Sequence, residues 1–181
     1  MKTILQIEDD VNDVFFLQQA MNKLGVEIPI HVARDGQEAI DYLKGAGKFA
    51  DREQFPLPSL VLLDLKLPQV MGLDVLRWIR RESGMTLIVV VLTASAEDVD
   101  IASAYSLGAN GFLVKPFLGT KLVEIAKSIN DFWLTHNILP AESVTGRTAA
   151  PVHSTTKSPD AIAYLDGASS GTRRTVAKAN K

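Results

Sequence analysis

The chain has 181 residues, of which 46% are apolar and 22% charged, a composition typical of one folded domain with a short extension. It contains no cysteine, which excludes disulfide bonds and thiolate metal sites. The formal net charge is −2, but six basic and three acidic residues follow residue 139, so the first 139 residues carry a net charge of −5 and are not expected to bind nucleic acid.

No segment has the pattern of a membrane or secretory sequence. The longest apolar run, residues 87–92, is too short to cross a bilayer, and the N-terminus lacks a signal-peptide pattern. We therefore expect a cytoplasmic protein without a membrane partner.

Short apolar segments alternate along the chain with segments of helical periodicity. The expected strands are residues 2–7, 28–33, 60–64, 86–94 and 111–116. The expected helices follow them in turn, at residues 11–24, 36–45, 72–81, 97–108 and 118–136. In the first helix, for example, Val14, Leu17, Met21 and Leu24 recur on one face, and Gly25 is the expected stop.

Five strands alternating with five helices predict a parallel sheet covered by helices on both faces. The nearly unbroken apolar strands agree, because burial on two faces removes the polar alternation. We expect a flavodoxin-like, doubly wound α/β fold with strand order 2-1-3-4-5, in which ligands bind at the carboxyl ends of the strands.

Two segments stand apart from this alternation. Residues 45–58 form a long connection before the third strand, with room for a short helix or a flap. Residues 140–181 are rich in Ala, Ser, Thr and Gly and show little periodicity, so we predict a flexible, disordered tail after a domain at residues 1–139.

Acidic side chains gather where two neighbouring strands of the predicted sheet end. Glu8, Asp9 and Asp10 follow the first strand, and Asp64 closes the third. Any one of them could simply favour a helix start. Two carboxylates about 4 Å apart, however, repel by roughly 4 kcal/mol at an effective dielectric constant near 20, so the cluster needs a shared proton or a cation. Oxygen ligands favour a hard ion, Mg²⁺ or Mn²⁺.

Two more polar residues end the fourth and fifth strands at this same edge. Thr93 alone would commonly cap a helix, and Lys115 alone would commonly be solvated. Together with the ion and Asp64 they would form a phosphoryl-accepting site. In it Asp64 would be the nucleophile, the ion and Lys115 would neutralise charge on the transferred oxygens, and the Thr93 hydroxyl would donate to one of them. We expect a cis peptide bond before Pro116, which would aim Lys115 inward.

Four motifs in this order resemble the receiver domain of two-component response regulators, over about residues 1–135. They are IEDD at 7–10, LLDLKLP at 62–68, LTA at 92–94 and GANGFLVKPF at 108–117. The resemblance implies that a histidine kinase phosphorylates Asp64. It also implies that Asp9 binds the ion directly, that Glu8 does so through water, and that Asp64 and the backbone carbonyl of Lys66 complete the site.

The same resemblance implies a switch and leaves Asp10 with a helix-start role. Thr93 would move toward the aspartyl phosphate, and Phe112 would rotate inward behind it, as a shift between two packings. The side chain of Lys66 would tune dephosphorylation, in a direction that stays open.

The long segment at residues 47–68 and the FWL…LP ending are similar to single-domain regulators partnered with phytochrome-type kinases. That resemblance implies homodimers formed through the fourth helix, fifth strand and fifth helix. Phe132 and Trp133 lie either at such an interface or in the helix core.

Three other functions match the residues less well. A haloacid-dehalogenase phosphatase needs a second aspartate two positions after the first, where this chain has Lys66. A flavodoxin-like cofactor binder needs a phosphate-binding loop where this chain has IEDDVND, and a degenerate receiver would lack acceptor-site residues that are all present here.

We therefore expect a single-domain response regulator that signals through a protein partner or a homodimer. The alternative is a phosphorelay intermediate that passes the phosphoryl group to a histidine phosphotransfer domain. Neither is an enzyme in the metabolic sense, because the only expected chemistry is self-phosphorylation and self-dephosphorylation.

Overall fold

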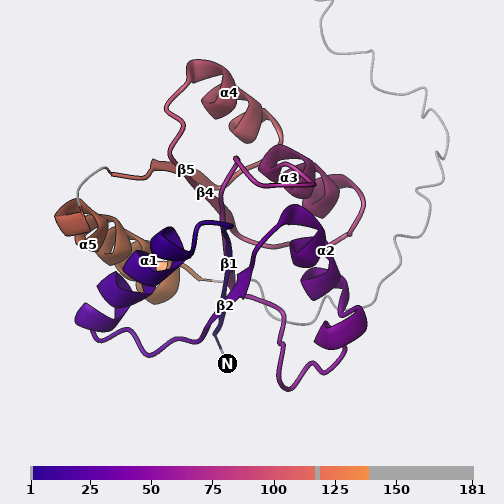
Figure 1. Cartoon of the computed structure of the whole chain (residues 1–181), viewed down its shortest axis with the longest axis horizontal. Coiled ribbons are helices and arrows are strands. Elements are labelled where there is room, and N and C mark those ends of the chain that lie inside the picture. Colours follow the sequence, from indigo (N-terminus) through magenta and orange to yellow (C-terminus); the bar gives the residue numbers. More distant parts are fainter. Residues whose placement is uncertain (1, 117–118, 139–181) are drawn as a thin grey trace, which may run out of the picture. The chain divides into compact units, whose positions relative to one another are not determined.

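The computed structural model describes residues 2–116 and 119–138, and its centre is a five-stranded parallel sheet in the order β2-β1-β3-β4-β5 (Figure 1). The strands are β1 (Ile4–Ile7), β2 (Ile30–Ala33), β3 (Leu60–Leu63), β4 (Val89–Thr93) and β5 (Gly111–Val114). The helices are α1 (Val11–Lys23), α2 (Gly36–Lys44), η1 (Gly47–Phe49), α3 (Gly72–Arg81), α4 (Asp98–Ser106), α5 (Gly119–Ser128) and η2 (Ile129–His136). The predicted fold class and strand order are confirmed.

The strand register brings the carboxyl ends of the central strands level. Ile7 of β1 pairs with Leu63 of β3, and Leu63 pairs with Val91 of β4. The residues that follow β1 and β3 are Glu8 and Asp64, so they emerge side by side. The three central strands are buried along their whole length, which explains their nearly unbroken apolar sequence.

The helices cover the two faces of the sheet and bury two large apolar clusters, beside a smaller one formed by Leu65, Val91 and Ala104. On one face, α1, α5 and η2 pack on β1, β3 and β4, with Leu17, Met21 and Ile129 against Ile4 and Leu62. The other face carries α2 and α3, which bury the alternate strand residues. Figure 1 shows α1 beside α5 on one side of the sheet and α2 and α3 on the other.

Helix boundaries follow local capping chemistry. The side chain of Asp10 accepts a hydrogen bond from Asn12 N at 2.7 Å and begins α1, so its predicted helix-start role is confirmed. The predicted last helix, at residues 118–136, is described as α5 followed by the wider, π-type turns of η2.

The long connection before β3 is packed down rather than open. It contains the short helix η1, whose Phe49 packs with Phe55 and Tyr42. The Arg52 guanidinium donates to the carbonyls of Tyr42 and Leu43 near the end of α2. These contacts explain how a connection of this length keeps a fixed course.

The described residues bear only in part on the predicted tail and on the expected lack of a membrane-spanning segment. The predicted tail at residues 140–181 lies outside the described residues, so that prediction stays untested. Within residues 2–116 and 119–138, every helix is too short or too polar to cross a membrane.

Candidate functional site

The candidate site is built where β1 and β3 end. Backbone hydrogen bonds fix both acidic positions, because Asp64 N donates to Ile7 O at 3.0 Å and Glu8 N donates to Ala33 O at 2.9 Å. Asp64 is 6% exposed and Glu8 is 3% exposed, whereas Asp9 lies open to solvent. Oxygen atoms of Glu8, Asp9 and Asp64 lie within 4.8 Å of one another, so the predicted acidic cluster is assembled.

Lys115 inserts its ammonium group into this cluster from the end of β5. Its Nζ donates to Asp64 Oδ2 and Asp13 Oδ2, both at 2.8 Å, and to Glu8. The Lys115 side chain is only 12% exposed. One cation therefore neutralises part of the charge of three carboxylates.

The predicted cis bond between Lys115 and Pro116 is wrong, because the bond is trans. Lys115 N donates to Thr93 O at 2.7 Å, which continues the β4–β5 hydrogen bonding past the end of β5. From that position the long side chain reaches Asp64 without a cis bond, and the intrinsic preference for trans prevails.

The two buried carboxylates have opposite pKa shifts. Burial is the largest effect at Glu8 and raises its pKa to about 7, despite the nearby Lys115. Burial also acts on Asp64, but the hydrogen bonds from Lys115 and Thr93 outweigh it and hold the pKa of Asp64 below its ordinary value. Asp64 is therefore ionised at neutral pH, as a nucleophile must be.

Burial lowers the pKa of the Lys115 ammonium, but its three carboxylate partners reverse this effect and raise the pKa. Lys115 therefore stays charged at physiological pH. A charged ammonium beside an ionised carboxylate is the arrangement that can stabilise a phosphoryl group on that carboxylate.

Two more predicted residues, Thr93 and Lys66, lie at Asp64, whereas a third, Phe112, packs apart from it. Thr93 is fully buried at the end of β4. Lys66 N donates to Asp64 Oδ1 at 3.2 Å, while the exposed ammonium of Lys66 lies 3.6 Å from Asp100. Phe112 does not join the polar cluster and packs, half-buried, against the apolar cluster of Leu65, Val91 and Ala104.

The donor set of the acidic cluster fits a hard divalent cation. Glu8, Asp9 and Asp64 each offer a carboxylate oxygen within one small region, and neither sulfur nor imidazole is among these three groups. Mg²⁺ and Mn²⁺ prefer such oxygen ligands, and an exposed Asp9 leaves room for bound water.

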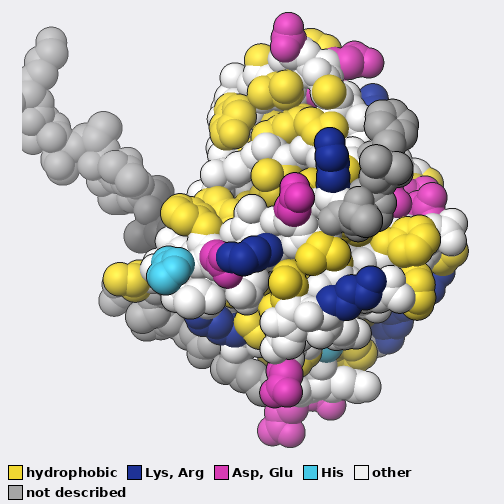
Figure 2. Space-filling view, turned by 90° about the vertical axis from the view of Figure 1, so that its left-hand side faces the viewer, with side chains coloured by type: hydrophobic (Ala, Val, Ile, Leu, Met, Phe, Trp, Pro, Cys, Tyr) yellow, Lys and Arg dark blue, Asp and Glu magenta, His cyan; other side chains and the backbone are white. Residues whose placement is uncertain are grey.

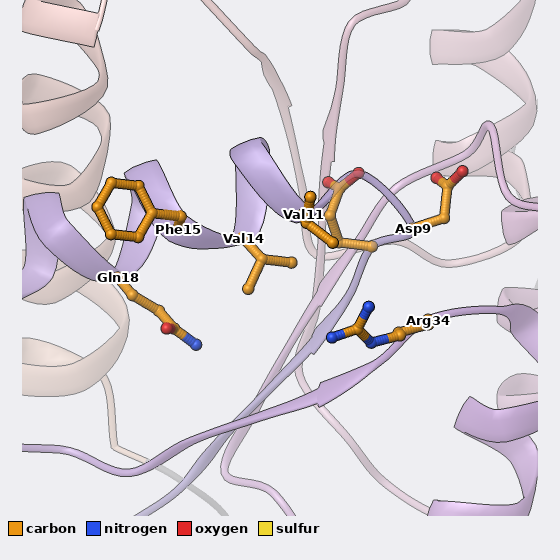
Figure 3. Close-up of a pocket in the computed structure, with 7 residues that line it drawn as sticks. Asp9, Val11, Val14, Phe15, Gln18 and Arg34 are labelled. Atoms are coloured by element: carbon orange, nitrogen blue, oxygen red, sulfur yellow. The ribbon is translucent and has the colours of Figure 1, made fainter.

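A pocket lies beside the acidic cluster, between α1 and the residue that follows β2. Figure 3 shows Val11, Val14 and Phe15 of α1 along it, with Asp9 and Arg34 at its other end. The pocket extends the edge of the site with an apolar wall, next to the open carboxylate of Asp9.

Asp13 is the site residue that sequence reasoning missed. It lies in the first turn of α1 and contacts a lysine 102 positions away. The available signal was its place in the first turn of the helix that directly follows the acidic residues Glu8, Asp9 and Asp10.

Comparisons with known proteins agree with this geometry. Residues 4–127 match the response regulator receiver domain family. The chain is 38% identical over 141 residues to the probable methanogenesis regulatory protein FilR2 of Methanothrix harundinacea, covering 76% of this chain and 86% of that protein.

Two further similar proteins, Rcp1 and RcpA, have solved structures. Response regulator Rcp1 of Synechocystis is 34% identical over 141 residues, covering 77% of this chain and 94% of Rcp1. Its Mn(2+)-bound structure has a TM-score of 0.71 at 33% identity, covering 78% of this chain and 100% of that one. The phosphorylated cyanobacterial phytochrome response regulator RcpA has a TM-score of 0.72 at 35% identity, covering 77% and 99%.

The family match spans the strands, the acidic cluster and Lys115, and the relatives are matched along most of their length. Response regulators with such receiver domains are signalling proteins rather than classical enzymes. This chain belongs to the family of response regulator receiver domains.

Proposed function

We propose that this protein accepts a phosphoryl group on Asp64 from a histidine kinase and passes the signal on by protein contact. The observation that carries the proposal is the environment of Asp64, an ionised carboxylate with 7% of its side chain exposed and 2.8 Å from the Lys115 ammonium. Asp64 thus combines a negative charge, limited exposure and a fixed cation.

In the proposed step an Asp64 oxygen attacks the phosphorus atom of a phosphohistidine. A P–O bond forms to Asp64 as the P–N bond breaks, and the bonding electrons leave with the imidazole nitrogen of the donor. Lys115 donates a hydrogen bond to a transferred phosphoryl oxygen, and the Thr93 hydroxyl donates to another. The product is an acyl phosphate that water later hydrolyses.

Glu8, Asp9 and Asp64, with the backbone carbonyl of Lys66, are the groups we assign to hold Mg²⁺ or Mn²⁺. The carboxylate cluster supports this assignment, and the relative Rcp1 has been solved in an Mn(2+)-bound form. When bound, the ion supplies charge neutralisation for the phosphoryl oxygens.

For signal output we propose a switch in which Thr93 moves toward the phosphoryl group and Phe112 turns inward. Phe112 supports this proposal by its place, because it is half-buried against the apolar cluster of Leu65, Val91 and Ala104 and follows β4 across the sheet on β5. The shift would alter the surface of α4, β5 and the last helices, which we assign as the homodimer face.

The relatives support a phytochrome-type kinase as the partner. RcpA is named a phytochrome response regulator, and a regulator of R. palustris solved in the context of red light signaling has a TM-score of 0.73 at 34% identity. Phosphotransfer profiling against the kinases of the same cell identifies the donor, and onward transfer to a histidine phosphotransfer domain would instead favour the relay role.

Acetyl phosphate with Mg²⁺ tests the acceptor assignment directly. We expect the wild-type protein to gain one phosphoryl group, detected by intact-protein mass spectrometry, and Asp64→Asn to gain none. Asp41→Asn, which changes an aspartate on α2, serves as the matched control and should be labelled like wild type. Equal labelling of the wild type and Asp64→Asn would refute the assignment.

A further inference from the structure

We propose that Asp13 is a positioning residue: it holds the Lys115 ammonium when Glu8 and Asp64 bind a divalent cation or Asp64 carries a phosphoryl group. This inference rests on the proposed function and adds a fourth carboxylate to the working parts of the site. Its basis is one contact, the 2.8 Å hydrogen bond from Lys115 Nζ to Asp13 Oδ2.

All the donor capacity of Lys115 is in use. An ammonium group has three N–H donors, and Lys115 Nζ directs them at Glu8, Asp13 and Asp64. A phosphoryl oxygen can gain a hydrogen bond from Lys115 only after one of these carboxylates gives up its own. The geometry thus requires an exchange of partners.

Two of the three partners also belong to the oxygen cluster suited to a cation. Glu8 and Asp64 lie in that cluster with Asp9, whereas Asp13 does not. Phosphorylation would also remove the full negative charge from Asp64. Asp13 is therefore the one partner of the three whose charge stays available to Lys115 throughout.

The position of Asp13 is fixed by α1 rather than by the site. Asp10 caps this helix, and the buried Leu17, one turn after Asp13, anchors it on the sheet. The Asp13 side chain is 42% exposed, compared with 7% for Asp64, so it stays solvated while it accepts from Lys115. A solvated anion on a fixed helix can hold the ammonium without itself entering the buried cluster.

The expected consequence is that Asp13 draws the ammonium away from Glu8 and Asp64 and so favours binding of a cation there. In Asp13→Asn the amide oxygen is a weaker acceptor, and Lys115 competes more strongly for Glu8 and Asp64. We expect the dissociation constant for Mg²⁺, measured by titration calorimetry, to rise about fivefold.

A double-mutant cycle separates action through Lys115 from a general effect of charge. In a Lys115→Met background the competing ammonium is gone, so Asp13→Asn should change the Mg²⁺ dissociation constant less than about twofold. A fivefold loss in both backgrounds, or none in either, overturns the proposal.

Two further variants make the result specific. Asp13→Glu keeps the carboxylate and should restore Mg²⁺ affinity to within about twofold of wild type. This comparison needs no Lys115 variant, and an Asp13→Glu protein as weak as Asp13→Asn would also overturn the proposal. Asp98→Asn removes an exposed acid from the first turn of α4 and should bind Mg²⁺ like wild type.

Labelling by acetyl phosphate gives an independent readout. Asp13→Asn should be phosphorylated more slowly than wild type, with no further slowing in the Lys115→Met background. A wild-type protein that takes up no phosphoryl group would refute the proposed function. The role of Asp13 would still be decided by the Mg²⁺ dissociation constants of the double-mutant cycle. If the wild type is labelled normally but Asp13→Asn changes Mg²⁺ affinity equally with and without Lys115, the role of Asp13 is refuted and the proposed function stands.

Discussion

Glu8 and Asp64 share one ammonium group, yet their pKa values move apart. Burial dominates at Glu8 and raises its pKa to about 7, while Asp64 also gains hydrogen bonds from Thr93 and from Lys66 N, which lower its pKa. At the scale of the residue, the number of donors decides which carboxylate carries a full charge. The side chain with the most donors is the one assigned as nucleophile.

His31 gives a prediction about pH. Burial lowers the pKa of His31, which packs against the rings of Tyr42 and Phe55 at centroid distances of 5.6 and 5.9 Å. The unfolded chain then binds more protons than the folded one just below the unfolded pKa of about 6.5, so this residue's contribution to stability falls as the pH falls through that region.

The measurement is urea unfolding of wild type and His31→Phe at pH 7.5 and pH 5.5. Both proteins share the other titrating groups, so we expect the wild type to lose more unfolding free energy between the two values than the variant does. Identical losses in the two proteins would show that His31 does not make this contribution.

At the scale of the element, α3 begins in direct contact with the backbone around Asp64. Gly72 is the first residue of α3, and a Cβ atom placed there would lie 2.1 Å from Asp64 O and 2.7 Å from Leu65 Cα. Only a glycine permits this approach, so the start of α3 and Asp64 are held together by van der Waals contact between backbones.

We predict that Gly72→Ala lowers the free energy of unfolding by about 2 kcal/mol, because α3 must move away from the chain at Asp64. It should also slow labelling of Asp64 by acetyl phosphate. Gly111→Ala is the matched control, since a Cβ there meets its nearest atom at 3.6 Å, an ordinary contact. Urea unfolding checks both, and equal costs for the two variants would contradict the argument.

The elements themselves could be predicted because their apolar periodicity is local. The strands around Leu5, Leu62 and Val90 are apolar on both faces, and that pattern alone indicates a buried parallel sheet. The convergence of Glu8, Asp64 and Lys115 followed from the sheet order. The contact of Asp13 with Lys115 did not, because it depends on the packing angle of α1. The expected cis bond before Pro116 was wrong, because the Lys115 side chain is long enough to reach Asp64 from a trans bond.

At the scale of the whole molecule, several large apolar side chains lie on the surface. Val99 and Tyr105 of α4 are 65% and 52% exposed, Val114 of β5 is 41% exposed, and Phe132 of η2 is 56% exposed. Figure 2 shows the molecule from the side of α1 and α5, with apolar side chains interspersed among charged ones. Such exposure on the elements of the assigned dimer face is what a second copy of the chain would cover.

We predict that Mg²⁺ with beryllofluoride, which imitates the phosphoryl group, shifts the protein to a dimer in sedimentation velocity. Tyr105→Glu places a charge in the assigned face and should weaken the dimer by at least about tenfold. Phe16→Glu, at an exposed position of α1 outside that face, should leave it intact. A monomer with and without beryllofluoride would exclude the homodimer.

The negative charge at this edge of the sheet also determines the order in which a divalent cation and a phosphoryl donor can bind. Glu8, Asp13 and Asp64 accept hydrogen bonds from the Lys115 ammonium, and Asp9 lies in one oxygen cluster with Glu8 and Asp64. Four carboxylates thus gather beside the Lys115 ammonium, so anions meet an unfavourable potential there. A phosphoryl donor is itself an anion, so we expect the carboxylates to repel it until a cation has offset their negative charge. Encounters made in the absence of divalent salt should therefore be unproductive, however abundant the donor.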